Sequence, residues 1–176
     1  MLYEAQFRNP AGAGKLIQAI RDMDLPELWI MEICGTHTMS IAKAGLRQIL
    51  PPHIHLISGP GCPVCVTPSG VMDEVLRISQ LPNVTITTYG DLLRVPGSVP
   101  GDNLQRRSAQ GADVRMVYSP MDSLDMAEQE PDREFIFLGV GFETTAPGTA
   151  IAVQEAKVRG RKNFSLLSLR DRKSVV

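Results

Sequence analysis

The feature that most constrains this 176-residue sequence is a regular alternation between short apolar runs and stretches with helical spacing of apolar residues. The runs have the length of β-strands and are bounded by Gly, Pro and Asn. We predict strands over 28–33, 54–57, 84–88, 114–118, 135–140 and 164–169, and helices over 14–23, 38–50, 68–78, 104–111, 121–129 and 147–158. This pattern predicts an α/β fold of alternating βαβ units, with a mostly parallel sheet and Rossmann-like layers.

The expected domain organisation follows from the same pattern. Residues 1–167 are predicted to form the folded α/β region, as two consecutive or interleaved subdomains, and the Pro- and Gly-rich segment 94–102 is a candidate seam. A parallel strand normally leads into another helix, but residues 168–176 are polar and stop abruptly. We therefore expect 168–176 to be a non-native or disordered tail, and the chain to be truncated.

Charge and cysteine content exclude several classes of protein. The chain has 18 basic and 19 acidic residues and a net charge of −1, which gives no reason to expect nucleic acid or an anionic membrane as a partner. It has neither a run of about 20 apolar residues nor the basic start and apolar stretch of a secretory signal. Three cysteines are too few for a secreted disulfide framework. We expect a cytoplasmic protein whose cysteines are metal ligands or redox thiols.

Cys34-Gly35-Thr36-His37-Thr38 follows the first predicted strand and begins a helix, where open α/β sheets bind ligands. Backbone N–H groups and the helix dipole favour a thiolate at this position, and a thiolate is the form that binds metals. His37 is placed to donate a hydrogen bond or charge to a bound group. The alternative interpretation is a buried structural cysteine beside an N-capping threonine.

Gly59-Pro60-Gly61-Cys62-Pro63-Val64-Cys65 is a Cys-x-x-Cys segment after a predicted strand and before a predicted helix. Two thiols at this spacing either form a disulfide or bind one metal ion. A zinc site needs a second ligand pair, and His53 and His55 fit a strand edge better than a ligand role. The pattern favours a redox dithiol over a zinc site, and the alternative is a tight turn with incidental cysteines.

The segment Gly139–Pro147 partly resembles a dinucleotide-binding loop, but it lacks the third glycine of that motif. Glu143 is a candidate acid, base or hydrogen-bond partner. Its alternative role, shared with Thr144 and Thr145, is to cap the following helix.

Taken in order, three stretches resemble the signature segments of the HypD family of NiFe-hydrogenase maturation factors, namely Cys34–Thr38, Gly59–Cys65 and Gly141–Pro147. The connecting segments Tyr89–Asp91, Arg94–Ser98 and Val117–Pro120 are similar as well. The resemblance covers the chain to about Leu167. It implies an iron-handling scaffold and leaves open whether the protein is an enzyme.

The resemblance also implies partners. Such proteins bind a small chaperone, HypC, and the complex carries the iron on which the Fe(CN)2CO unit is assembled. Cyanide arrives from HypE, which carries it as a thiocyanate made through HypF, and the finished unit passes to the hydrogenase large subunit. Soft thiolate ligands suit iron of this kind.

By the match, Cys34 would be the iron ligand, shared with a cysteine of the chaperone, and Cys62 and Cys65 would be a thiol/disulfide pair connected to electron transfer. The catalytic cleft would include His37 and Glu143, and the iron unit would contact Gly35, Thr36, Thr38, Gly141 and Thr144. Full-length relatives also carry a C-terminal cysteine set for a 4Fe-4S cluster, whereas this chain has no cysteine after Cys65.

Two other functions remain open at this point. A stand-alone thiol oxidoreductase would use Cys62 and Cys65 and would keep disulfide reductase activity when Cys34 is replaced. A nucleotide-binding α/β module would use residues 139–147 and would bind ATP or NAD.

Overall fold

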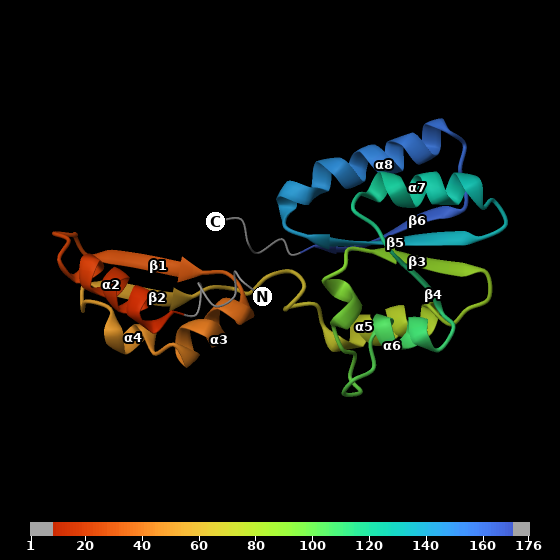
Figure 1. Cartoon of the computed structure of the whole chain (residues 1–176). Coiled ribbons are helices and arrows are strands. Elements are labelled where there is room, and N and C mark those ends of the chain that lie inside the picture. The colour runs from red at the N-terminus through yellow and green to blue at the C-terminus, as the bar shows by residue number, and fades with distance from the viewer. Residues whose placement is uncertain (1–8, 171–176) are drawn as a thin grey trace. The chain divides into compact units, whose positions relative to one another are not determined.

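The computed structural model of the chain describes residues 9–170, which form two compact units that divide between Gly61 and Cys62. Figure 1 shows the elements of each unit. All strand pairs found among the described residues are parallel. The α/β fold predicted from the alternation of strands and helices is confirmed.

The first unit contains a two-stranded parallel sheet formed by β1 (Leu28–Glu32) and β2 (Ile54–Ser58). The pairing places Leu28 opposite Ile54 and Glu32 opposite Ser58. From residue 9 onward, the helices of this unit are α2 (Pro10–Arg21), α3 (Gly35–Lys43) and α4 (Leu46–Ile49). Arg47 of α4 donates hydrogen bonds to the Leu56 carbonyl and to Ser58 Oγ, at 2.7 and 3.2 Å, and so ties this helix to β2.

The second unit contains a four-stranded parallel sheet in the order β4-β3-β5-β6. Its strands are β3 (Val84–Thr88), β4 (Asp113–Met116), β5 (Glu134–Gly141) and β6 (Phe164–Arg170). Helices α5 (Ser69–Ile78) and α6 (Leu104–Ala109) cover one face, and α7 (Pro120–Gln129) and α8 (Ala146–Val158) cover the other (Figure 1). Short 3-10 turns, η1 (Leu92–Arg94) and η2 (Glu143–Thr145), follow β3 and β5.

Side chains that alternate along the strands of the second unit build a core on each face of its sheet. On the α5–α6 face, Ile86 and Leu138 join a buried cluster with Met72, Leu76 and Leu104. On the other face, Thr87 of β3 and Ser123 of α7 share a buried hydrogen bond of 2.6 Å. The central strands β3 and β5 are therefore largely buried on both faces, as expected for a parallel sheet covered by helices on each side.

Several predicted boundaries were wrong in detail. The helix expected at 14–23 begins at Pro10, because Asn9 Oδ1 accepts the Ala11 amide at 3.0 Å and caps it there. The helix expected at 38–50 begins at Gly35 and is interrupted at Gly45, which has a left-handed backbone (φ 62°).

The division of the chain and its C-terminal end also differ from the predicted organisation. The segment 94–102 is not a seam, because Ser98 is bound through its amide to Asp73 of α5 at 2.8 Å and the division falls at Gly61–Cys62. Residues 168–170 of the expected tail continue strand β6, and residues 171–176 lie outside the described part of the chain.

Within residues 9–170, every helix falls short of the length and apolar character needed to span a membrane.

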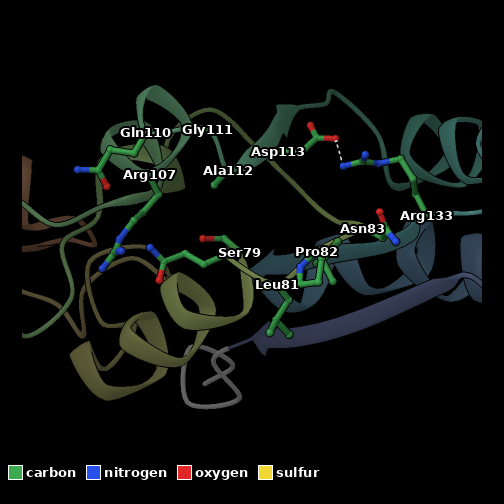
Figure 2. A pocket seen from close by; sticks show the side chains of 12 residues that line it. Ser79, Leu81, Pro82, Asn83, Arg107, Gln110, Gly111, Ala112, Asp113 and Arg133 are labelled. Atoms are coloured by element: carbon green, nitrogen blue, oxygen red, sulfur yellow. Dashed lines mark hydrogen bonds and ion pairs between the residues drawn. The ribbon is translucent and has the colours of Figure 1, made fainter.

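A cavity of about 390 Å³ lies at the amino ends of β3 and β4, lined by residues 79–84 and 110–113 with Arg107 and Arg133 (Figure 2). Arg133 is bound to Asp113 at 2.7 Å, and Arg115 bridges Asp113 and Glu130. Burial acts to raise the pKa of Asp113, but hydrogen bonds from Arg115 and Thr85 and the two guanidinium charges outweigh it and lower the pKa. Because ligands of such sheets bind at the opposite, carboxyl ends, we assign this network to stability.

Phe137→Ala should destabilise the second unit strongly, because the Phe137 ring is fully buried. Removing it leaves a cavity, and we expect the free energy of unfolding in urea to fall by about 3–5 kcal/mol. Val158→Ala serves as the control, since this side chain is 79% exposed and its truncation should change stability by no more than about 0.5 kcal/mol. Similar small losses for both variants would show that the core is misassigned.

Asp113→Asn should remove part of the acid sensitivity of the fold. The folded-state pKa of Asp113 is lowered, so its carboxylate contributes stability above the unfolded pKa of about 3.9 and loses that contribution as the pH falls through the folded value. Urea titrations at neutral and acidic pH should therefore show the wild type and variant converging as the pH drops. A gap that stays constant with pH would contradict this account.

Candidate metal centre

The parallel pairing of β1 and β2 brings the carboxyl ends of the two strands together. Glu32 and Ser58, the last residues of these strands, lie opposite each other. Directly beyond them, the Gly59 amide donates a 2.7 Å hydrogen bond to the Glu32 carbonyl. Cys34 follows Glu32 by two residues and Cys62 follows Gly59 by three, so the covalent chain keeps both cysteines near this point.

Gly59 is required by the close approach of the two strand ends. A Cβ at this position would overlap the carbonyl oxygen of Glu32 and crowd the side chain of Met31. Any larger residue would push the two chain segments apart. Gly59 therefore allows the two cysteine-bearing segments to lie close together.

Cys34 occupies the N-cap position of α3, with an extended backbone (φ −136°, ψ 132°) and a half-buried side chain. Its carbonyl accepts the amides of His37 and Thr38, at 2.8 and 3.1 Å. Its side chain makes no capping hydrogen bond. The thiol therefore stands at the start of a helix, as the sequence predicts, without taking the capping role that Ser or Asp has at this position.

Glu32 takes part in the site although it is not among the residues predicted from the sequence. Its carboxylate accepts the Cys34 amide at 3.1 Å and the Thr38 hydroxyl at 2.5 Å. The Thr38 hydrogen bond is the largest of the effects that lower the pKa of Glu32, with Ser58, the Cys34 amide and the charge of His37 adding to it against the effect of burial. A usable signal was present, because Glu32 is an acidic residue within the otherwise apolar run 28–33.

The Cys-x-x-Cys segment forms a compact turn. The Sγ atoms of Cys62 and Cys65 are 3.1 Å apart, and the Cys65 amide lies 3.4 Å from Cys62 Sγ. The Val66 amide donates to the Cys62 carbonyl at 3.0 Å, and Val64 packs against the core of the second unit. Cys62 is half-buried and Cys65 is exposed, so the pair is both held in place and accessible.

The sulfur atoms of Cys34, Cys62 and Cys65 lie within 4.8 Å of one another. No His, Asp or Glu side chain joins this group within residues 9–170. Thiolates are soft ligands that suit iron, zinc or copper(I), and three of them leave a coordination position for a further ligand. The cysteine cluster can therefore bind a metal ion.

The other predicted site residues lie in two places. Gly35, Thr36 and His37 are exposed in the first turn of α3, directly beyond Cys34. Gly141 ends β5, and Glu143 and Thr144 are exposed in η2. Both groups follow the carboxyl end of a parallel strand, and their part in a common site stays a prediction.

His53 and His55 lie at the other end of β2. The His55 ring stacks on Trp29, with ring centroids 4.2 Å apart, and its Nε2 lies 3.0 Å from Glu27 Oε1. These contacts support the interpretation of His55 as a strand-edge residue.

Comparison with known proteins identifies the family. Residues 12–174 match the sequence profile named HypD, described as the hydrogenase formation hypA family. The chain belongs to the HypD family. It is 52% identical over 168 residues to the hydrogenase maturation factor HypD of Rhizobium leguminosarum bv. viciae, 47% over 173 residues to that of Rhodobacter capsulatus, and 46% over 172 residues to that of Escherichia coli K12.

These alignments cover 93–94% of the chain but 43–45% of the relatives, so the chain spans less than half the length of these HypD proteins. The 4Fe-4S cluster that the resemblance implies for full-length relatives was assigned to a C-terminal cysteine set, and this sequence has no cysteine after Cys65.

Gly59→Ala should destabilise the first unit, because the new methyl group would displace the chain from the Glu32 carbonyl. We expect the free energy of unfolding to fall by about 1–3 kcal/mol. The matched control is Gly70→Ala in α5, where the added methyl group meets no neighbouring atom within 4 Å and should be neutral or stabilise the helix by about 0.5 kcal/mol. Equal effects of the two substitutions would refute the close approach.

Proposed function

We propose that this chain is a hydrogenase maturation factor that holds iron on the Cys34 thiolate while the Fe(CN)2CO unit is assembled. The observation that carries the proposal is the group of three sulfur atoms within 4.8 Å of one another. Family membership supports it, since the relatives are named hydrogenase maturation factors. The iron unit is cargo in this scheme and leaves with the hydrogenase large subunit.

The proposed partner at the iron is a HypC-type chaperone, which supplies a second thiolate from its own cysteine. Cys34 suits a shared ligand because its backbone is fixed by hydrogen bonds to its amide and its carbonyl. A preorganised ligand loses less conformational entropy when a partner and a metal bind. We place this assembly in the cytoplasm, with HypE as the cyanide donor and HypF acting before it.

The proposed redox step uses Cys62 and Cys65 as a two-electron donor. A thiocyanate R–S–C≡N from HypE is cleaved at its S–C bond as the two thiols form a disulfide. The products are R–SH, cyanide and one proton, so two thiol hydrogens and two electrons are accounted for. The 3.1 Å separation of the two sulfur atoms favours disulfide closure, since little movement is needed to reach the bond length of about 2.05 Å.

His37, Thr36 and Glu143 are proposed to line the reaction cleft. Gly35, Thr38, Gly141 and Thr144 are proposed to contact the iron unit, because backbone N–H groups at helix starts bind anionic groups such as cyanide. Thr38 also donates its hydroxyl to Glu32, and this bond holds the turn from which these groups are proposed to act. These roles extend the family resemblance to individual residues.

A stand-alone thiol oxidoreductase is the second candidate. The close Cys62–Cys65 pair and the exposure of Cys65 favour it, because an attacking or resolving thiol has to be accessible. This function needs no Cys34. Replacing Cys34 therefore separates the two proposals.

Cys34→Ser should abolish iron-bound cyanide and CO. The chain would be co-expressed with a HypC-type chaperone, HypE and HypF, and the purified complex examined by infrared spectroscopy and iron analysis. We expect cyanide and CO bands with the wild type and a loss of at least about tenfold in Cys34→Ser, since a hydroxyl is a poor ligand for this soft site. Ser40→Ala, an exposed serine of α3, is the control.

Bands retained in Cys34→Ser would contradict the role of Cys34 as the iron ligand. Disulfide reductase activity that survives in this variant and disappears in Cys62→Ser would favour the oxidoreductase instead.

A further inference from the structure

Glu32 holds the turn that carries Cys34. One carboxylate oxygen accepts the Cys34 amide at 3.1 Å, and the other accepts the hydroxyl of Thr38, one helical turn further on. The two bonds bracket the first turn of α3 from its start to its fourth residue. Since the Cys34 side chain provides no cap, the carboxylate fixes the backbone at the point where the thiol leaves it.

The same residue also holds the segment that leads to Cys62. The Glu32 carbonyl accepts the Gly59 amide at 2.7 Å, and Glu32 is in register with Ser58 on β2. Gly59 precedes Cys62 by three residues. Glu32 thus joins both cysteine-bearing segments, through its side chain on one side and its main chain on the other.

We propose that Glu32 is a positioning residue that sets the separation between Cys34 and Cys62. It does so by anchoring the Cys34 turn to the strand end that also binds Ser58 and Gly59. The residue contributes no atom to the group of metal-ligand sulfurs. The inference rests on the proposed function, in which both cysteines act at one iron, but its test requires no iron.

The test measures how quickly a short bifunctional thiol reagent bridges Cys34 and Cys62. Dibromobimane becomes fluorescent once it has reacted with two neighbouring thiols, and a Cys65→Ser background leaves Cys34 and Cys62 as the reactive pair. We expect rapid bridging in this background. Glu32→Ala should slow it about tenfold, because misplacing reacting groups by about 1 Å costs up to 100-fold in rate.

Glu32→Gln distinguishes positioning from charge. The glutamine carbonyl can accept the Cys34 amide while its NH2 group donates to Thr38 Oγ1, so bridging should return to within about twofold of the background rate. Thr38→Val removes one of the two side-chain bonds without changing charge and should slow bridging about threefold. Glu27→Ala is the matched control, since Glu27 is exposed, bonds to His55, and should have no effect.

Circular dichroism and thermal melts would confirm that each variant is folded. Three results would overturn the inference. The first is a bridging rate in the background protein that is no faster than in urea, and the second is an equal bridging rate in Glu32→Ala and the background. The third is a bridging rate in Glu32→Gln that stays as low as in Glu32→Ala. If Glu32→Ala does not fold, Thr38→Val decides, and an unchanged rate in that variant overturns the inference. Iron loading is measured separately, so the proposed function can fail while this result stands.

Discussion

The candidate site depends on the parallel pairing of β1 with β2. Antiparallel strands would send the chain away from opposite ends of the sheet, but parallel strands release it at the same edge. Because Glu32 is in register with Ser58, the segments that carry Cys34 and Cys62 begin side by side. Cys34 and Cys62 are 28 residues apart in the sequence, and the pairing of two adjacent strands brings the segments that carry them together.

The Cys-x-x-Cys turn is held in place by packing against the second unit. Val64, between its two cysteines, packs against the core of the second unit, and α5 begins only four residues after Cys65. The central strands β3 and β5 of this unit are largely buried, so the turn is attached to a well-packed support. The thiols therefore gain their placement from hydrogen bonds at Cys34 and from apolar packing at Val64.

Much of this could be predicted from the sequence. The alternation of strands and helices indicated the fold class, and strand 84–88 was placed without error because its β-branched residues are bounded by clear breaks. The cysteines and the glycine motif indicated where the chemistry lies. The bonds of Glu32 could not be predicted, because they depend on strand register and on a side chain that folds back onto the turn after its own strand.

The helix break at Gly45 and the role of Asp73 in holding Ser98 were missed for a related reason. Apolar periodicity reports which face of an element is buried, but not which polar side chain satisfies a given backbone group. Local hydrogen bonds decide such details after the elements have packed.

The ion-pair network of Asp113, Arg115 and Arg133 has a consequence for protein engineering. It lies at the amino end of the β3 layer, whereas the dithiol turn precedes α5, which starts at the carboxyl end. A five-residue strand is roughly 16 Å long, beyond the 7–10 Å over which substitutions usually influence one another. Substitutions in this network should therefore change thermostability with little effect on the dithiol turn at the other end of the sheet.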